Sequence, residues 1–546
     1  MRYNIFSYNR QTLATLLVGA LAGAGLASCS EDTYTPDPDR GWESTTDVFV
    51  PTDETGFSTY YNPAIGTCGD PMPYYDQKSG EFRILYLQEF AQNTESYHPM
   101  WLLSTKDCAN YTNLGEVLPA GAAAEQDAGV GTGCCVYDAE QETYYIYYTG
   151  HNAACPQTEA VMRATSTDGL HYKKDMVWML KGAEYGLSDT DFRDPQIFAG
   201  DDNRWHMVVS GKLQFAEFVS DNLQDWTLAE SFGMPWGRMS ECPDVFKMGD
   251  WWYMILSDQD KYGRCIKYFK GRTWAELKNA VKNAWFPNAD EGKLDSRGYF
   301  AAKTAGNGQD RYIWGWCPIR YGADIYAKNT SVRDDVEPAW AGALVCHRIA
   351  QKEDGQLAFV PVPGIASKYG KSVQPVVVEQ TEGADFDGMN GRISGFGMVR
   401  FSRLGYHNHI SMTVKTRNAG DKFAFCFVRG EHKDGEENKW FQMGFNNQHW
   451  ESGKSNLCRV EFKLEGNDAE GRYFDQFVNG ALSNFVPRPA DNTYNIDIFT
   501  DNSVVVVYYN NVLSYTTRIY GIQKNGWSIN SLGGEIEVSD LKVTQY

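Results

Sequence analysis

The sequence predicts an all-β protein with two folded domains, a five-bladed β-propeller followed by a β-sandwich. Three observations predict this fold class. Of the 546 residues, 14% are aromatic and 52 are glycine, which favours short strands and tight turns over long helices. One hairpin pattern recurs about five times between residues 70 and 360. From about residue 375, apolar and polar residues alternate with period two instead.

The repeated hairpin predicts the propeller. Each copy has a short strand, a polar turn and a strongly apolar, aromatic strand, and the copies begin at Tyr74, Val136, Ile197, Val245 and Ala301. The starts lie about 50 to 60 residues apart, which is the length of a four-stranded blade. A second hairpin follows most copies. We therefore expect a propeller over residues 56–363. The alternative, two stacked sheets, rarely repeats a motif at so long a period.

Residues 375–546 predict the β-sandwich. Alternating segments such as 423–428 and 504–509 are separated by turns rich in Gly, Asn and Asp. We see no cluster of acidic residues or histidines there that resembles an active site. We expect this domain to pack against the propeller, with sugar binding as the less favoured alternative.

Residues 1–28 predict a lipoprotein signal peptide. Arg2 and Arg10 precede an apolar stretch that is too short for a comfortable membrane span. Leu26-Ala27-Ser28-Cys29 then resembles a bacterial lipobox, which predicts lipidation of Cys29. An ordinary signal peptide with an incidental Cys29 is the alternative.

Residues 29–55 predict a flexible tether, because they are rich in Asp, Thr and Pro and carry no core pattern. The acidic Ser30-Glu31-Asp32 resembles a surface-export signal of Gram-negative bacteria. We therefore expect an outer-membrane lipoprotein at the cell surface, or alternatively at the periplasmic face. Its contact with the membrane would be made by the lipid anchor alone.

The charge and the cysteines narrow the range of ligands. The formal net charge of −20 repels nucleic acid, whereas neutral sugars fit this surface and bind through hydrogen bonds and aromatic stacking. Of 12 cysteines, 11 remain after Cys29 is set aside. No Cys-x-x-Cys pair and no histidine at zinc spacing accompanies them. We expect no metal, no cofactor, few if any disulfides, and a monomer.

Three short acidic motifs open successive copies of the repeat and carry the functional prediction. They are Gly69-Asp70-Pro71, Arg193-Asp194-Pro195 and Glu241-Cys242-Pro243. Because the innermost strand of each blade begins near the propeller axis, these acids would face one mouth. We expect each proline to restrain the preceding residue to extended geometry and so to fix the angle of the acid. Converging carboxylates are what cleavage of a glycosidic bond requires.

Three acids in one pocket raise one another's pKa, which predicts different roles for them. Glu241 follows the apolar Met239 and would be the general acid if it is the most desolvated. Asp70, as a carboxylate, could attack the anomeric carbon. Asp194 could stay ionised, held by Arg193 or another donor, and stabilise the positive charge that grows on the sugar ring.

At this point the residues resemble a known family. Phe192-Arg193-Asp194-Pro195 and Glu241-Cys242-Pro243-Asp244 resemble two signatures of glycoside hydrolase family 32, the fructan hydrolases and invertases. The resemblance covers roughly residues 56–363 and continues into the C-terminal β-sandwich. It implies that Asp70 is the nucleophile, Asp194 the transition-state stabiliser and Glu241 the acid/base. It also implies retaining hydrolysis of β-fructofuranosyl bonds in levan, inulin or sucrose-type substrates, with the Asp70 and Glu241 carboxyls roughly 5–5.5 Å apart.

The first motif departs from the family pattern. The family has Trp-Met-Asn before Asp-Pro-Asn-Gly, whereas this chain has Thr67-Cys68-Gly69 before Asp70-Pro71-Met72-Pro73. By the resemblance, the Asn side chains of the family pattern shape the subsite that binds the fructosyl ring. Because this chain lacks them, its preference for fructose stays open. A milder change is Thr132-Gly133-Cys134 in place of Ser-Gly-Ser.

Five further residues are candidate substrate contacts, and three of them are weighed against a stated structural alternative. Arg193 could clamp sugar hydroxyls or serve as the partner of Asp194. Gln88 could contact sugar or form a turn hydrogen bond, and His98 could line the pocket or be a satisfied loop residue. The others are Trp236, just upstream of Glu241, and Thr132.

Two other functions remain open at this stage. One is an inverting five-bladed hydrolase of arabinofuranosides or xylosides, which also sets three acids around a funnel. The other is a surface lipoprotein that only captures glycan, which the altered first motif favours and the three preserved acids oppose.

Overall fold

The structure is a computed structural model that describes residues 59–64, 66–89, 98–233, 240–260, 263–284, 294–320, 338–429, 438–445, 457–467, 473–487, 489–523 and 526–546. The predicted signal peptide, the tether, Cys29 and Trp236 lie outside these ranges. Within them, no helix is long and apolar enough to cross a membrane.

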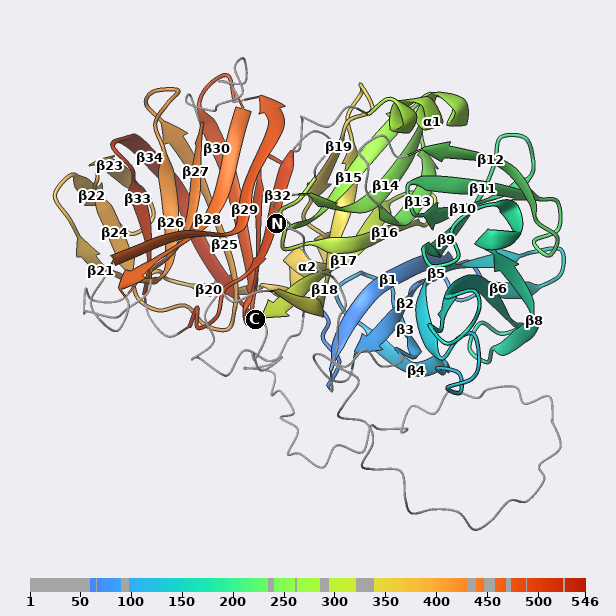
Figure 1. Cartoon of the computed structure of the whole chain (residues 1–546). Helices are drawn as coiled ribbons and strands as arrows, with labels where there is room; N and C mark the ends of the chain where they lie inside the picture. The colour runs from blue at the N-terminus through green and yellow to red at the C-terminus, as the bar shows by residue number, and fades with distance from the viewer. Residues whose placement is uncertain are drawn as a thin grey trace, which may run out of the picture. The chain divides into compact units, whose positions relative to one another are not determined.

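The described residues form five successive propeller blades, as the repeat predicts (Figure 1). The first two blades contain β1 (Thr67–Asp76), β2 (Glu81–Glu89), β3 (Met100–Thr105) and β4 (Thr112–Leu118), then β5 (Gly129–Asp138), β6 (Thr143–His151), β7 (Glu159–Ser166) and β8 (Lys173–Lys181). A short 3₁₀ helix, η1 (Gly182–Tyr185), leads to blade 3, with β9 (Phe192–Ala199), β10 (Trp205–Gly211), β11 (Gln214–Ser220) and β12 (Thr227–Gly233). Each expected inner hairpin of these blades is confirmed, because β1 pairs with β2, β5 with β6 and β9 with β10.

Blades 4 and 5 complete the ring. They contain β13 (Glu241–Met248), β14 (Trp251–Asp260), β15 (Gly263–Gly271) and α1 (Trp274–Lys282), then β16 (Phe300–Gly306), β17 (Arg311–Arg320), β18 (Pro338–Gln351) and β19 (Leu357–Val360). The inner strands β1, β5, β9, β13 and β16 contact one another in this order, and β16 contacts β1. Strand β18 also pairs with β1 through Gly342 and Cys68. The first and last blades therefore close the ring.

Blade 4 differs from the two-hairpin pattern, since its described residues form three strands followed by helix α1. Thr273 caps this helix by accepting a hydrogen bond from the backbone N–H of Glu276, and the Glu276 carboxylate accepts one from the N–H of Arg272. This is a variant of the capping box, in which Glu276 reaches the residue before the cap, and its Thr-x-x-Glu pattern is readable in the sequence. Leu277 and Val281 bury the apolar face of the helix against the blade.

The C-terminal domain is a sandwich of two antiparallel sheets. A short helix, α2 (Pro363–Lys368), precedes it. One sheet has the order β22 (Ala384–Phe386), β23 (Gly391–Gly395), β34 (Gly534–Gln545), β25 (His407–Thr416), β30 (Thr493–Asp501), β31 (Val504–Tyr509) and β32 (Leu513–Arg518), with β20 (Lys371–Val373) on β34. The other has the order β21 (Val377–Gln380), β24 (Met398–Phe401), β33 (Gly526–Ser531), β26 (Phe423–Arg429), β27 (Asn438–Phe445), β28 (Leu457–Asn467) and β29 (Tyr473–Pro487).

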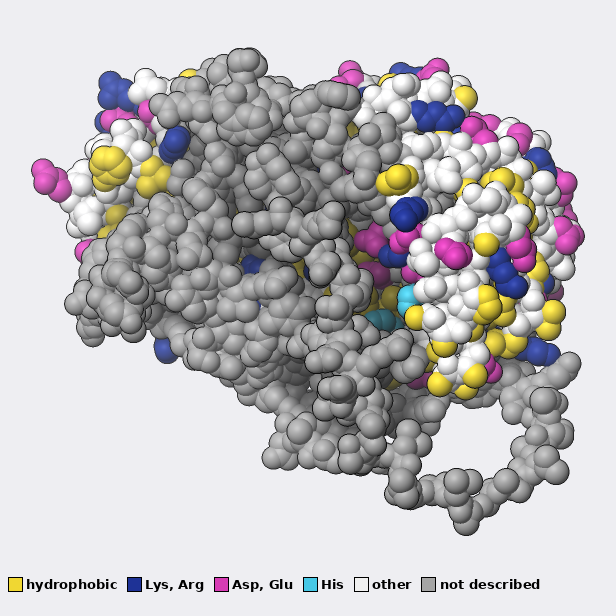
Figure 2. Space-filling model, in the orientation of Figure 1, with side chains coloured by type: hydrophobic (Ala, Val, Ile, Leu, Met, Phe, Trp, Pro, Cys, Tyr) yellow, Lys and Arg dark blue, Asp and Glu magenta, His cyan; other side chains and the backbone are white. Residues whose placement is uncertain are grey.

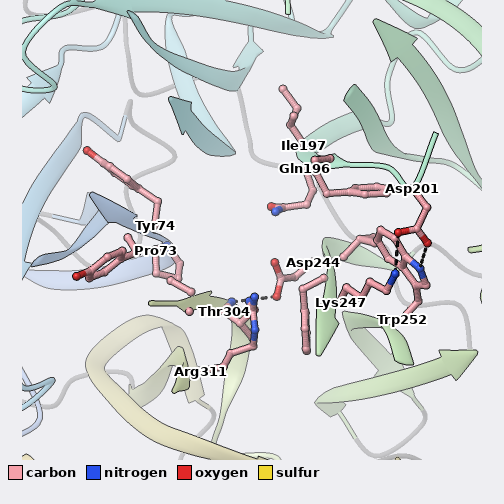
Figure 3. A pocket seen from close by; sticks show the side chains of 17 residues that line it. Pro73, Tyr74, Gln196, Ile197, Asp201, Asp244, Lys247, Trp252, Thr304 and Arg311 are labelled. Carbon is pink, nitrogen blue, oxygen red and sulfur yellow. Dashed lines mark hydrogen bonds and ion pairs between the residues drawn. The ribbon is translucent and has the colours of Figure 1, made fainter. Parts of the chain in front are cut away.

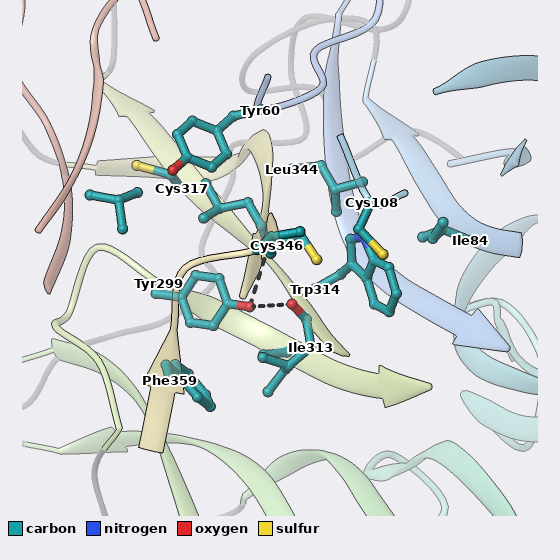
Figure 4. Packing of buried hydrophobic residues seen from close by; sticks show 14 of the residues in the cluster. Tyr60, Ile84, Cys108, Tyr299, Ile313, Trp314, Cys317, Leu344, Cys346 and Phe359 are labelled. Atoms are coloured by element: carbon teal, nitrogen blue, oxygen red, sulfur yellow. Dashed lines mark hydrogen bonds between the residues drawn. The ribbon is translucent and has the colours of Figure 1, made fainter. Parts of the chain in front are cut away.

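One buried apolar cluster runs from the propeller into the sandwich. It joins Ile84 of blade 1 and Trp314 of blade 5 to Val506 and Tyr508 of β31. Figure 4 shows part of this cluster, with Tyr299 donating hydrogen bonds from its hydroxyl to backbone carbonyls of blade 5. Continuous burial of this kind holds the two domains together, as the expected packing role of the sandwich requires.

Buried polar groups also form hydrogen bonds between the propeller and the sandwich. Asp295, which is fully buried, accepts hydrogen bonds from the Ser514 hydroxyl at 2.6 Å and from the Thr516 backbone N–H at 2.6 Å, both on β32. His347 Nε2 lies 3.1 Å from the same carboxylate. Arg518 donates in the other direction, to the Cys317 and Pro318 carbonyls of blade 5.

We expect Asp295→Ala to lower the free energy of unfolding by about 3 kcal/mol, because it leaves several buried donors without an acceptor. Urea denaturation of the purified full chain measures the loss. Asp385→Ala, on the exposed edge strand β22, is the matched control and should stay within about 0.5 kcal/mol of the wild type. A loss below about 1 kcal/mol for Asp295→Ala would contradict the pinning role.

Candidate active site

The inner strands carry a β-bulge at corresponding positions, and the bulges position the acids. The pairing register shifts between Gly69 and Met72 on β1, across Asp194 and Pro195 on β9, and between Glu241 and Asp244 on β13. Asp70 and Asp194 therefore occupy equivalent places in their blades, whereas Glu241 lies one residue before its bulge. A bulge redirects side chains locally, and bulges are common beside active sites.

The backbone at these bulges corrects one expectation. Asp70 and Asp194 have φ of 34° and 60°, so the following prolines do not hold them in extended geometry. Cys242 and Ala301 occupy the same bulge position on β13 and β16, with φ of 51° and 52°. Aspartate tolerates this left-handed region better than most residues. The bulge, not the proline, fixes the angle of each acid, and the proline occupies a position where its missing N–H leaves no broken ladder bond.

Asp70 is held by two donors from other blades. The Thr132 hydroxyl on β5 donates to Asp70 Oδ2 at 2.7 Å, and the Trp316 indole N–H on β17 donates to Oδ1 at 2.9 Å. Each carboxyl oxygen keeps a second lone pair for another contact. Asp70 is partly exposed, whereas Trp316 is fully buried behind it.

Asp194 lies deeper, with 4% of its surface exposed. Its Oδ2 accepts a hydrogen bond of 2.8 Å from the backbone N–H of Cys242, the residue after Glu241. Its own N–H donates to the Thr149 hydroxyl at 2.9 Å. These contacts join the bulges of blades 3 and 4, so that the second and third acids are brought together.

Arg193 connects Glu241 to two further acids that the sequence interpretation missed. One terminal nitrogen lies 3.0 Å from Glu241 Oε1, Nε lies 2.8 Å from Glu159 Oε2, and the other terminal nitrogen lies 3.0 Å from Asp191 Oδ1. The expected pairing of this arginine with Asp194 is not among these hydrogen bonds, although its charge still lowers the pKa of that acid. Glu159 also lies 3.4 Å from His151.

The site shifts the pKa of two of the three acids upward. Burial, reinforced by the charge of Glu241, raises the pKa of Asp194 to about 7. Burial also raises the pKa of Glu241, where Arg193 opposes the shift and Asp70 reinforces it. The raised pKa therefore belongs to two neighbouring acids that influence each other, and not to Glu241 alone. Glu241 is the more accessible of the two, with 26% of its side chain exposed.

We expect Asp194 to make the folded protein less stable as the pH rises from about 4 to about 7. Its pKa is about 7 in the folded state and about 3.9 in an unfolded chain, so the folded state binds more protons within this window. The Asp194→Asn variant lacks this loss. Its melting temperature relative to the wild type should rise across the window and level off above about pH 8.

Asp175→Asn is the control for this pH series, because hydrogen bonds from Trp178 and Arg163 outweigh partial burial and lower the pKa of that acid. Its melting temperature relative to the wild type should stay constant between pH 5 and 8. A constant difference for Asp194→Asn as well would contradict the raised pKa.

The structure places two more predicted contacts beside Asp70. Thr132 hydrogen-bonds to it, and His98 is close enough for the Asp70 charge to raise its pKa, although burial lowers the pKa of this imidazole overall. Gln88 is different. It is buried, its side-chain oxygen accepts a hydrogen bond from the Tyr86 hydroxyl at 3.0 Å, and its contact with sugar stays a prediction.

Next to the acids, inner-strand residues of neighbouring blades contact one another. Buried Lys303 donates from Nζ to the Gly133 carbonyl at 2.8 Å and lies 3.2 Å from Gln196 Oε1. Met72, which replaces the expected Asn, accepts a hydrogen bond of 3.0 Å from the Gly133 N–H through its sulfur. Figure 2 shows acidic, basic and histidine side chains gathered in a hollow on the propeller face.

A separate cavity of about 310 Å³ lies farther along the inner strands (Figure 3). Its lining includes Asp244, Thr304 and Arg311, and it contains none of the three acids. Arg311 donates to the Thr304 hydroxyl at 2.8 Å. Within the described ranges, no group of three or more His, Cys, Asp and Glu side chains could hold a metal ion. Cys68, Cys108, Cys134 and Cys242 are buried free thiols, and burial raises the pKa of the Cys242 thiol well above its usual value.

Comparison with family models decides which family this site belongs to. The model described as "Glycosyl hydrolases family 32 N-terminal domain" matches residues 61–361, which is more than half of the chain. The chain belongs to glycoside hydrolase family 32. A second model of the same family, "GH32, BT1760-like, C-terminal domain", matches residues 355–543.

Family 32 relatives extend the match. The levanbiose-producing levanase of Bacillus subtilis (strain 168) is 27% identical over 192 residues, covering 32% of this chain and 34% of that enzyme. The sucrose-6-phosphate hydrolase of Escherichia coli is 28% identical over 247 residues, covering 40% and 46%. The chain spans less than half the length of the curated relatives it matches.

The fold is that of family 32 structures. The structure of fructan 1-exohydrolase IIa from Cichorium intybus aligns with a TM-score of 0.66 at 14% identity, over 90% of this chain and 97% of that one. The expected propeller and C-terminal sandwich are thereby confirmed.

Proposed function

We propose that this chain hydrolyses β-fructofuranosyl linkages of fructan- or sucrose-type substrates with retention of configuration. The observation that carries the proposal is that Asp70, Asp194 and Glu241 lie at or next to the bulges of three blades, close enough to contact or to shift one another's pKa, in a chain of family 32. Relatives named levanase and sucrose-6-phosphate hydrolase support the substrate class.

In the first step, Asp70 attacks the anomeric carbon while the bond to the leaving oxygen breaks. The hydrogen bonds from Thr132 and Trp316 hold its carboxyl group in a fixed orientation, so little reorganisation precedes the attack. Glu241, whose pKa is raised, delivers its proton to the leaving oxygen. The product is a fructosyl ester on Asp70 and a free leaving group.

In the second step, Glu241 takes a proton from water, and the water oxygen attacks the anomeric carbon and displaces Asp70. Two displacements at one carbon retain its configuration. We expect the two carboxyl groups to lie roughly 5–5.5 Å apart, as retaining enzymes require.

Asp194 and Arg193 support these steps. Positive charge on the sugar ring favours the ionised form of Asp194, which at a pKa of about 7 is readily available at neutral pH. Arg193 lies against Glu241 and two other carboxylates, so it both orients the acid/base and limits its pKa. A direct contact between Arg193 and sugar hydroxyls stays a prediction.

The test is to incubate the purified full chain with levan, inulin, sucrose and arabinan and to follow the first anomer released by NMR. We expect β-fructofuranose from one or more of the first three substrates and no product from arabinan. First release of the inverted anomer would remove the retaining mechanism. Binding of levan or inulin without any hydrolysis would instead support a glycan-capturing protein.

We further propose that the enzyme is tethered to the outer membrane through a lipid on Cys29, at the cell surface. The lipobox-like Leu26-Ala27-Ser28-Cys29 and the acidic residues after it support this placement. Labelling with a radioactive fatty acid should mark the wild type and not Cys29→Ala. Equal labelling of both proteins would overturn the anchor.

A further inference from the structure

The cavity of about 310 Å³ lies farther along the inner strands than the three acids (Figure 3). Most of its lining comes from the inner strands of four blades, at residues 73–75, 196–199, 244–247 and 304–306. On β1, β9 and β13 this lining begins two or three residues after the acid of the same strand. Because a strand rises about 3.3 Å per residue, the cavity begins roughly 7–10 Å beyond the acids. It is therefore separate from the catalytic site.

Asp244 is a buried carboxylate that points into this cavity (Figure 3). Only 2% of the residue is exposed, and its Oδ2 accepts a hydrogen bond of 3.0 Å from the backbone N–H of Thr304. Burial raises the pKa of this acid, although hydrogen bonds from Thr304 and the charge of Arg311 oppose the shift. A carboxylate has about four acceptor positions, so Asp244 can accept further hydrogen bonds from a molecule in the cavity.

Two other side chains bring donors to the same space. Arg311 donates from one terminal nitrogen to the Thr304 hydroxyl at 2.8 Å, and among the described residues it forms no ion pair with Asp244. Most of its five N–H donors are thus left for another acceptor. Gln196 turns its oxygen to Lys303 at 3.2 Å, which leaves its amide N–H groups as donors. A buried acid and a cation therefore line one cavity without bonding to each other directly.

The charges around the cavity balance. Lys247 Nζ lies 2.7 Å from Asp201 Oδ1, and the Trp252 indole N–H donates to the other oxygen of Asp201 at 2.9 Å. The charges of this pair cancel, as do those of Arg311 and Asp244. A lining without net charge that offers both donors and acceptors favours a neutral molecule with hydroxyl groups over an ion.

We propose that this cavity is a second binding site, which holds one neutral sugar unit. Neighbouring hydroxyls of the sugar bridge the two charged groups, one donating to Asp244 and the other accepting from Arg311. Hydrogen bonds to charged groups are stronger than those between neutral groups, so this bridge favours binding. The volume lies at the lower end of the range for ligand sites and suits a single ring. The inference goes beyond the proposed function, because no bond is cleaved at this site.

The experiment is equilibrium dialysis of the purified full chain against radiolabelled fructose. We expect the wild type to bind two equivalents at saturation, one at the proposed active site and one in the cavity. Asp244→Asn should weaken one of them by at least about tenfold, because the charged acceptor is lost while the amide oxygen still accepts from the Thr304 N–H. Arg311→Met should weaken the same equivalent by a similar factor. Arg392→Met, on β23 with 66% of its side chain exposed, is the matched control and should bind as the wild type.

Two results would overturn the inference. One is fructose binding that Asp244→Asn and Arg311→Met both leave unchanged, in which case the cavity holds water only. The other is a wild type that binds no fructose. Melting temperatures show that the variants are folded, and if Asp244→Asn is not, Arg311→Met supplies the result.

Failure of the proposed function would look different from failure of this inference. A wild type that cleaves no fructoside, but binds one equivalent of fructose that Asp244→Asn weakens, would remove the proposed function and support the second site. Cleavage of fructosides, together with one equivalent of bound fructose that neither variant changes, would keep the proposed function and overturn the second site.

Discussion

Asp70→Asn is expected to reduce kcat by at least about 10⁴-fold on every substrate that the wild type cleaves. The amide is nearly the same size as the carboxylate, so Trp316 can still donate to its oxygen, and the Thr132 hydroxyl can rotate to accept from its nitrogen. In the proposed mechanism, the variant loses the negative oxygen that attacks the anomeric carbon.

Steady-state kinetics of the purified full chain measure this loss, and the melting temperature shows that the fold is intact. Asp250→Asn is the matched control, because Asp250 is 90% exposed in the turn between β13 and β14 and should leave kcat unchanged. Residual activity above about 1% in Asp70→Asn would exclude the nucleophilic role.

The sequence was a good guide to those parts of the fold that depend on local pattern. The five inner hairpins lie where a short strand, a polar turn and an aromatic strand follow one another in the sequence. The aromatic pattern is visible because these strands bury side chains against the neighbouring blades. The same periodicity put Asp70, Asp194 and Glu241 in phase, and the bulges do bring them together. Helix α1 was missed although its capping box was readable, because the expectation of a second hairpin took precedence over the local signal.

Contacts between distant residues could not be predicted in this way. Trp316 donates to a carboxylate 246 positions away, and Trp340 packs on Gly69 from another blade. Nothing in the local sequence around either tryptophan indicates its partner. The same holds for Asp295, which accepts hydrogen bonds from the sandwich strand β32, more than 200 positions along the chain.

The assignment of protons also required the structure. The sequence interpretation gave the neutral-pH proton to Glu241 on the condition that it is the most desolvated of the three acids, and depth of burial cannot be read from neighbouring residues in the sequence. Asp194 is the most buried of the three acids. Arg193 forms its ion pairs with Glu241, Glu159 and Asp191 instead. Burial and the arginine therefore act in opposite directions on the acid/base.

Glu241→Gln is expected to lower kcat on levan or sucrose-type substrates by about 10³-fold, within the range that general acid catalysis contributes. Glutamine keeps the shape of the side chain and can still accept a hydrogen bond from Arg193, so substrate binding should persist. Protonation of the leaving oxygen fails, and so does activation of water in the second step.

Both failures concern a proton transfer. The defect of Glu241→Gln should therefore shrink with a substrate and a nucleophile that need no proton transfer. A fructoside with a nitrophenol leaving group needs no acid, and added azide can attack the fructosyl ester without a base. We therefore expect azide to restore turnover of such a substrate by Glu241→Gln and to yield the β-fructosyl azide, but not to restore Asp70→Asn in this way. Glu353→Gln, an exposed turn residue of blade 5, is the matched control and should behave as the wild type. If azide leaves Glu241→Gln unchanged, or restores Asp70→Asn to the same product, the two roles have been assigned to the wrong carboxylates.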